Sequence, residues 1–277
     1  MTEAAMTGMY RYRVSRIWQE LQAEGKQEGG LAVEDLQHLD QYHYLGTEAI
    51  DVAGNYLLLD SASHVLDIGA GVAGTARYLA SRYGCRVTAL ELQEHLHEAG
   101  VELTRRCGLD HLVQGVVGDF LSFDPGTQRF DAWISLLVFL HIGDRAQLFA
   151  KSRAVLRPGG RFYIEDYFQR RPLSQAEINT LEQVVACPYL PSRDRYIADL
   201  EAAGFIDIEF EDVTHLWQPW VEQRFEQFVA NHDHYQRLHG AEMVAAQTDF
   251  YGAIAQLYQA GNVGGARIWG RCQAEGV

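Results

Sequence analysis

The chain has 277 residues, of which 47% are hydrophobic and 22% charged, a composition typical of folded globular proteins and not of disordered or fibrous ones. Its formal net charge of −14 argues against nucleic acid or an anionic membrane as a partner, because either surface would repel it. No apolar run approaches the roughly 20 residues of a membrane span, and the first residues lack the pattern of a secretion signal, so we expect a cytoplasmic protein. The four cysteines form no CxxC pair, and we expect neither a metal site nor disulfide bonds.

The first predicted elements are helices. Apolar residues at positions 14, 17, 18 and 21 share one helix face, which predicts an amphipathic helix. A second helix is predicted over 47–58, after the segment DQYHYLG at 40–46. We assign residues 1–60 to a helical N-terminal extension or cap that lies outside the core.

From His64 onward, predicted strands and helices alternate. HVLDI is a short apolar strand, GAGVAG a glycine turn, TARYLASRYG a helix and RVTALE a second strand. Further strands are predicted near 112–117, over 130–136 and, after a turn at 157–160, over 161–167, with helices over 93–107 and 144–156. This alternation predicts a Rossmann-like, mostly parallel sheet with helices on both faces, and we assign residues 61–168 to a cofactor-binding core.

The rhythm changes after residue 168. A polar loop, a predicted helix over 176–185 and a proline-bearing stretch suggest a cap insertion at 169–192. The sheet then resumes in residues 193–277, with a helix over 193–203 and strands over 205–210 and 266–270. Between these strands, residues 215–262 are predicted to form a helical lid that brings aromatic side chains such as Trp217 to an acceptor pocket. His232 and His234 are two positions apart and do not share a helix face, so we predict no metal site there.

The glycine turn lies between a strand and a helix, the context in which it can hold a ligand. Glycines let the backbone approach the ligand closely, and Glu91, twenty positions after Gly71, can bind ribose hydroxyls. A dinucleotide and S-adenosylmethionine both fit this pattern. Asp67 lies two positions before Gly69, where a carboxylate would repel a pyrophosphate and attract the ammonium and sulfonium groups of S-adenosylmethionine. We therefore favour S-adenosylmethionine.

Other residues at the ends of predicted strands complete the expected cofactor site. Asp119 follows the third strand, where its carboxylate can accept the adenine amino group beside the ring of Phe120. The predicted cofactor-binding residues are Asp67, Gly69, Gly71, Glu91, Leu92, Asp119, Phe120 and Leu136.

At this point the chain resembles the class I S-adenosylmethionine-dependent methyltransferases. The resemblance covers residues 40–210 and rests on VLDIGAGVAG, Glu91, GDF and LRPGGRF, which occur in this order. It implies a seven-stranded sheet whose last strand is antiparallel, which suits pairing of 205–210 with 266–270. It also implies that Gly69 and Gly71 face the methionine part, Asp67 the amino group, Glu91 the ribose and Asp119 the adenine.

Two short segments are similar to a small-molecule branch that includes sarcosine and dimethylglycine methyltransferases and related natural-product enzymes. They are DQYH at 40–43 and FLH at 139–141. Those enzymes tend to carry polar or acidic side chains just before FLH, whereas this chain reads SLLV at 135–138, which argues for a less polar acceptor. We expect a small-molecule methyltransferase, with an amine or amino-acid-like nitrogen favoured over a hydroxyl oxygen. An NAD-dependent oxidoreductase and a non-catalytic binding protein remain as alternatives.

The sequence offers several candidates for the acceptor side. His141 and His43 can serve as a base near neutral pH, although each could equally be a structural histidine. Tyr10, Tyr42 and Tyr44 can form an aromatic wall that attracts a methylated cation, with plain packing as the alternative. Arginines flanking the cap can bind a carboxylate or phosphate, with solvated side chains as the alternative; they are Arg171, Arg193 and Arg195. We expect a monomer or a homodimer.

Overall fold

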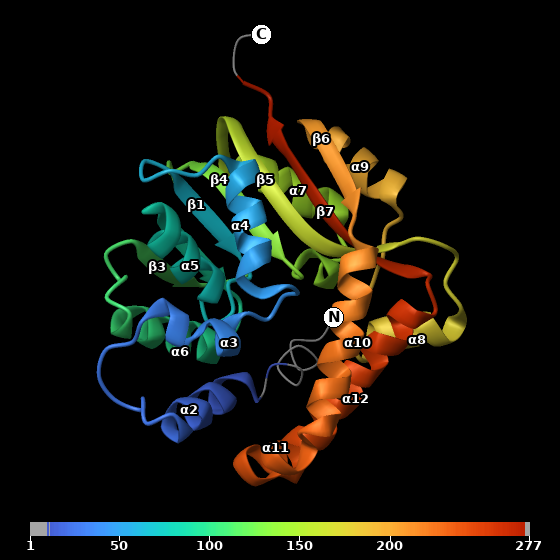
Figure 1. The fold of residues 1–277 in the computed structure, drawn as a ribbon. Helices are drawn as coiled ribbons and strands as arrows, with labels where there is room; N and C mark the ends of the chain where they lie inside the picture. The colour runs from blue at the N-terminus through green and yellow to red at the C-terminus, as the bar shows by residue number, and fades with distance from the viewer. Residues whose placement is uncertain (1–9, 11, 275–277) are drawn as a thin grey trace.

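A seven-stranded sheet forms the centre of the protein (Figure 1) in this computed structural model, which describes residue 10 and residues 12–274. The strand order is β3-β2-β1-β4-β5-β7-β6, and every pairing is parallel except those that β7 makes with β5 and β6. The strands are β1 (His64–Ile68), β2 (Arg86–Glu91), β3 (Val113–Val117), β4 (Phe130–Leu136), β5 (Leu156–Gln169), β6 (Phe205–Asp212) and β7 (Val263–Cys272). The expected Rossmann-like fold and its antiparallel last strand are confirmed.

Helices cover both faces of this sheet, as the apolar strands require. In β4, Ala132 and Ile134 pack with α4 (Gly46–Leu57) and α5 (Gly74–Tyr83). Trp133, which points the other way, packs with α7 (Arg145–Ala154) and α9 (Arg193–Ala202). A parallel strand that is buried on both sides has an apolar residue at almost every position, which explains runs such as HVLDI.

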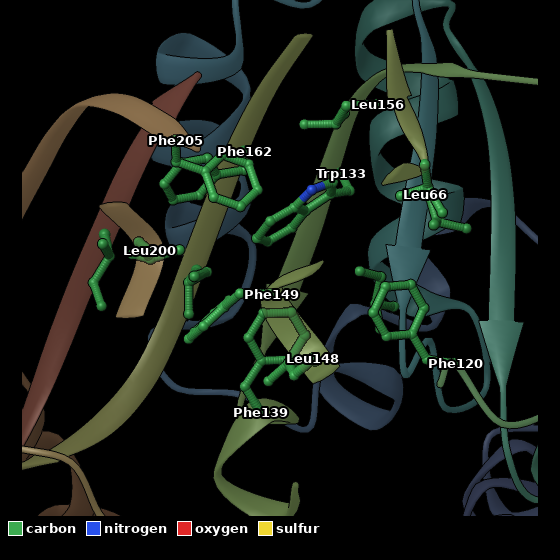
Figure 2. Packing of buried hydrophobic residues seen from close by; sticks show 14 of the residues in the cluster. Leu66, Phe120, Trp133, Phe139, Leu148, Phe149, Leu156, Phe162, Leu200 and Phe205 are labelled. Carbon is green, nitrogen blue, oxygen red and sulfur yellow. The ribbon is translucent and has the colours of Figure 1, made fainter. Parts of the chain in front are cut away.

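Trp133 lies at the centre of the larger of these clusters (Figure 2). Its ring stacks on Phe162 with centroids 5.0 Å apart, and Phe149 of α7 lies nearby in the same cluster. Its indole Nε1 donates a hydrogen bond to the carbonyl of Ser152 at 3.0 Å, so the buried polar atom is satisfied. This packed cluster therefore fixes the positions of β1 and β4, and with them the carboxyl ends of both strands.

Capping side chains set where three of the helices begin. Asp144 accepts a hydrogen bond from the backbone N–H of Gln147 at the start of α7. Ser174 forms a capping box with Glu177 at the start of α8 (Gln175–Gln183). Ser192 caps α9 by accepting a hydrogen bond from the backbone N–H of Arg195. These oxygens satisfy N–H groups that a helix leaves unpaired in its first turn.

The N-terminal helix, in the region assigned above to an extension or cap, buries its apolar face against the rest of the protein. Ile17 and Leu21 of α2 (Arg13–Ala23) are at most 1% exposed and pack against Leu103 of α6 (Glu94–Arg106). The next elements are η1 (Val33–Asp35) and α3 (Gln37–Asp40). At the end of α3, Asp40 forms a fully buried ion pair of 2.9 Å with Arg77 of α5. Residues 13–40 are thus fastened to the helices that cover the sheet.

The RPGG segment at 157–160 was predicted as a turn before a strand, but it lies inside β5. Phe130 of β4 pairs with Leu156, whereas Ala132 pairs with Arg161, so β5 carries extra residues opposite one step of β4. The positive φ of Gly159, 76°, allows this irregularity. A local turn and a β-bulge both favour proline and glycine, so only the pairing with β4 shows which of the two this segment forms.

Three helices inserted between β6 and β7 project from the body (Figure 1). They are α10 (Thr214–Ala230), α11 (His232–His239) and α12 (Ala241–Gln259). Their far end contacts α2, where the ring nitrogens of His239 lie 2.7 Å from Gln19 Oε1 and 3.0 Å from Glu20 Oε1. We call α10, α11 and α12 the helical lid. Within the described part of the chain, no helix is both long and apolar enough to cross a membrane.

Candidate active site

A cavity of about 460 Å³ opens where β1, β2 and β4 end. The strand order reverses between β1 and β4, and ligands of open α/β sheets bind at such a point. Its lining comes from the glycine turn, the loops after β2, β3 and β4, and the N-terminal segment. The lining residues discussed below are Tyr10, Tyr42, Gly69, Gly71, Glu91, Leu92, Asp119, Phe120, Leu136, Leu137, Val138 and His141.

The backbone conformation favours glycine at both position 69 and position 71, and at Gly69 there is also no room for a side chain. Their φ angles are 73° and 56°, in the left-handed region that other residues rarely adopt. A Cβ on Gly69 would lie 2.5 Å from Cγ2 of Val138, and one on Gly71 would lie 3.4 Å from Cδ2 of Tyr42. The turn therefore presents bare backbone to the cavity.

Two carboxyl groups lie beside this turn, and no Lys or Arg side chain among the described residues forms an ion pair with either of them. Glu91 accepts hydrogen bonds from the backbone N–H groups of Gly71 at 2.8 Å and Gln93 at 2.9 Å, and burial raises its pKa. Asp67, at 3% exposure, is the last but one residue of β1 and precedes the lining residue Ile68. Burial and the neighbouring Glu91 carboxylate raise the pKa of Asp67 to about 7, and its Oδ2 has no partner among the described residues. A positively charged ligand would offset the repulsion between the two carboxyl groups and the cost of burying them.

The other predicted cofactor residues line the same cavity. Leu92 is 42% exposed and Phe120 5% exposed, so one wall is open and the other packs into the core. Asp119 keeps its loop in place because its Oδ1 accepts the N–H of Leu121 at 3.0 Å. Leu136 forms the end of β4 at the cavity wall. The structure brings these four residues together at the ends of three strands, β2, β3 and β4.

His141 faces the cavity with a defined tautomer. Its Nδ1 lies 3.0 Å from the carbonyl oxygen of Ala186, which can only accept, so Nδ1 carries the hydrogen and Nε2 a lone pair. The hydroxyl of Tyr10 lies 3.5 Å from that Nε2. Burial lowers the pKa of His141 to about 4, which keeps the ring neutral at pH 7.

The backbone next to His141 is strained. Leu137, a lining residue, has a φ of 57°, an unfavourable value for a branched side chain. Its N–H donates to the carbonyl of Glu165 at 2.8 Å, which holds it in this conformation. The SLLV segment therefore turns sharply where β4 ends.

Three other predicted acceptor residues lie outside the cavity lining. Both ring nitrogens of His43 are used within its own segment, by the carbonyl of Tyr44 at 3.1 Å and Oε1 of Gln41 at 2.8 Å. Tyr44 is buried, and its hydroxyl contacts that of Tyr167. Trp217 is fully buried and packs edge-on against Tyr44 with centroids 4.8 Å apart. The structure gives His43, Tyr44 and Trp217 packing roles behind the cavity, whereas Tyr10 and Tyr42 line it.

The predicted arginines also lie elsewhere. Arg171 is exposed, and Arg193 and Arg195 lie on the surface at the start of α9, where Arg195 pairs with Asp199 at 2.8 Å. Another arginine approaches the cavity instead, since the guanidinium carbon of Arg13 lies 4.4 Å from the ring centroid of the lining residue Tyr42. The spacing of Arg13 three positions after Tyr10 was the available signal for it.

The described residues hold no group of three or more His, Cys, Asp or Glu side chains arranged for a metal ion. All four cysteines are free thiols, and Cys85, Cys187 and Cys272 are buried.

Comparison with known proteins shows which proteins part of this chain resembles. Residues 65–160 match the family described as a methyltransferase domain. The chain is 37% identical over 155 residues to sarcosine/dimethylglycine N-methyltransferase of Halorhodospira halochloris, and the match covers 55% of each protein. The chain thus spans about half the length of that curated relative.

Solved structures share the fold. Phosphoethanolamine N-methyltransferase 2 of Haemonchus contortus, in complex with phosphomonomethylethanolamine and S-adenosylhomocysteine, superposes with a TM-score of 0.73 at 21% identity, covering 83% of this chain and 53% of its own. The [4+2]-cyclase SpnF superposes with a TM-score of 0.68 at 20% identity, covering 82% of this chain and 81% of its own. One fold thus serves different reactions. Residues 65–160 thus match the methyltransferase domain family, and the chain carries the fold of the class I methyltransferases.

Proposed function

We propose that the chain is an S-adenosylmethionine-dependent methyltransferase that methylates the amine nitrogen of a small molecule. The observation that carries this proposal is the buried pair of Asp67 and Glu91 beside the glycine turn, with one oxygen of Asp67 left unpartnered. A cationic cofactor supplies the missing positive charge, whereas a pyrophosphate would meet two carboxyl groups. The same pair therefore disfavours an NAD-dependent oxidoreductase.

The lining residues fit each part of this cofactor. The backbone of Gly69 and Gly71 would hold the methionine part, and Glu91 would bind the ribose. Asp119 and Phe120 would flank the adenine. When bound, S-adenosylmethionine supplies a methyl group on a positively charged sulfur, which needs little activation by the protein.

The protein's main contribution is then to hold the acceptor in line and to take its proton. His141 Nε2, neutral and aimed at Tyr10, can accept the proton that the nitrogen loses as its new bond to carbon forms. Tyr10 orients the nitrogen through its hydroxyl oxygen. Leu137 and Val138 exclude water from that end of the cavity.

Two measurements test this function. Isothermal titration with S-adenosylmethionine and with NAD⁺ should show binding of the first alone. Incubation with methyl-labelled cofactor and a metabolite extract should label a product, and amines and hydroxyl compounds tested singly then separate N- from O-methylation. Binding of NAD⁺ without S-adenosylmethionine would reject the proposal, and cofactor binding without any labelled product would favour a non-catalytic protein.

The cellular setting is part of the same proposal. A free small molecule in the cytoplasm is the expected acceptor, and the net charge of −14 disfavours nucleic acid as a partner. We expect a monomer or a homodimer, which light scattering on a sizing column distinguishes.

A further inference from the structure

Three arginines from two helices converge on one tyrosine of the helical lid. Arg13 and Arg16 lie one turn apart on α2, and Arg224 lies on α10. The guanidinium carbon of Arg224 lies 4.2 Å from the ring centroid of Tyr251 on α12. Burial acts to raise the pKa of Tyr251, yet the charges of Arg224, Arg13 and Arg16 lower it overall. We call Arg13, Arg16, Arg224 and Tyr251 the arginine cluster.

The faces of α2 explain why the cluster forms. Ile17 and Leu21 bury one face against α6, which leaves the face carrying Arg13 and Arg16 toward the lid. Arg16 accordingly lies over the ring of Tyr235 on α11, 5.9 Å from its centroid. Packing of the apolar face thus fixes the position of the charged side chains beside it.

The charges of this cluster are not neutralised within the described chain. No described carboxylate forms an ion pair with Arg13, Arg16 or Arg224. Their Nε atoms, and Nη2 of Arg224, are buried without a hydrogen-bond partner among the described residues.

Nearby carboxylates are already engaged. Asp40 pairs with Arg77 at 2.9 Å, Glu20 with His239 at 3.0 Å, and Glu91 accepts backbone N–H groups. In a chain of net charge −14, three guanidinium groups without an ionic partner among the described residues indicate a site built for an anion.

One aromatic ring connects this cluster to the methyl-transfer cavity. Arg13 covers the ring of Tyr42, which lines the cavity beside Gly71. Arg224 likewise lies 5.1 Å from the ring centroid of Tyr44, two positions further along. A ligand with its nitrogen at His141 would extend toward the arginines past Tyr42.

We propose that Arg13, Arg16 and Arg224 bind an oxyanion of the methyl acceptor, a carboxylate or a phosphate, so that the acceptor is an amine that also carries an anionic group. This inference rests on the proposed function and narrows it. It excludes neutral and purely cationic amines as the preferred acceptors. Bidentate contacts from guanidinium groups hold the anionic end and leave the amine at His141.

A first experiment needs no turnover. Inorganic phosphate and acetate are titrated separately into the full chain while tryptophan fluorescence is followed, since Trp220 lies 4.7 Å from the guanidinium carbon of Arg224. Saturable binding of at least one anion is expected, weakened about tenfold in Arg16→Gln and Arg224→Gln. Arg237→Gln, the same change at an exposed position of α11, is the matched control and should bind as the wild type does. Absence of saturable binding of both anions to the wild type would overturn the proposal.

A second experiment identifies the source of the anion. Phosphoethanolamine is compared with ethanolamine, and sarcosine with its amide, as methyl acceptors. The anionic member of at least one pair should have a kcat/KM about tenfold higher or more, and Arg224→Gln should abolish this preference without changing the Kd of S-adenosylmethionine. Arg224→Lys should keep part of the preference, which separates lost charge from lost folding.

Two results of this second experiment would refute the assignment. Equal use of the neutral acceptors by the wild type is one. A loss of S-adenosylmethionine affinity at unchanged acceptor KM is the other, because it would assign the arginines to the carboxylate of the cofactor. If the wild type does not bind S-adenosylmethionine at all, the proposed function fails, while the phosphate and acetate titrations still decide whether the cluster binds anions.

Discussion

The two sides of the cavity are built in different ways. The cofactor side consists of the glycine turn and the ends of β2 and β3, each a short segment attached to one strand. The acceptor side combines Tyr10 and Tyr42, the loop after β4 and the arginine cluster between α2 and the lid. A mutation on one side should therefore leave the other side's ligand unaffected, and this independence can be tested.

The largest effect is expected at His141. His141→Ala should lower kcat by about 10²-fold or more, as is typical when a general base is lost, with little change in the Kd of S-adenosylmethionine. Rate measurements at saturating substrates, with calorimetry for the cofactor, check this. His111→Ala, on the surface, is the control. Unchanged turnover in His141→Ala would show that His141 is not the base.

The cofactor side should respond in the opposite way. Asp67→Asn and Glu91→Gln should each weaken S-adenosylmethionine binding by about 1 to 3 kcal/mol, because each removes a charged partner of the cofactor. The acceptor KM should stay within about twofold. Titration calorimetry measures the first, with the exposed Glu201→Gln as the control. Full affinity in both variants would mean that the cofactor binds elsewhere.

Cofactor affinity should also depend on pH through Asp67. With a pKa raised to about 7, this carboxyl is largely protonated at pH 6, and a bound cation favours its ionised form. Affinity should therefore rise between pH 6 and 8, by at most about tenfold per unit, with release of a proton. Calorimetry in buffers of different ionisation enthalpy detects that proton. The pH dependence should disappear in Asp67→Asn, and its persistence there would assign it to another group.

The smallest effect concerns the contact that joins α2 to the lid on the acceptor side. His239→Ala removes the hydrogen bonds to Gln19 and Glu20 and should lower the free energy of unfolding by about 1 kcal/mol. Hydrogen exchange should increase in α11, and acceptor KM should rise slightly more than cofactor Kd. Calorimetric melting and exchange measurements check this against His232→Ala, at the exposed start of α11. Equal protection of α11 in both variants would show that this contact does not hold the lid.

Much of the fold was predictable because its signals are local. β4 was predicted over 130–136 and occupies Phe130–Leu136, and α9 begins at Arg193 as predicted, after a serine cap. The start of β5 was missed, because the RPGG segment becomes a bulge only when β4 pairs with it. A pairing partner far away in the sequence leaves no local trace.

The candidate site divides along the same line. His141 was identified from a short motif, but the same reasoning also selected His43, whose nitrogens are bound within its own segment. Arg171 was selected for its place near the cap, whereas Arg13 and Arg224 have the environment suited to an anion. Residue type alone does not distinguish a binding side chain from a structural one. The burial of the side chain and its hydrogen-bond or ionic partners do.

The amino-acid sequence by itself determined the cofactor side. Its glycines, Asp67 and Glu91 lie within one strand-turn-helix-strand unit, whose geometry follows from backbone sterics and from a single parallel pairing. Only the tertiary structure decided the acceptor side, because α2, α10 and α12 meet through their apolar faces. The periodicity of the sequence predicts that these faces are buried, but it does not predict which element covers each of them. The arginines lie on or beside those apolar faces, and the same packing brings them together.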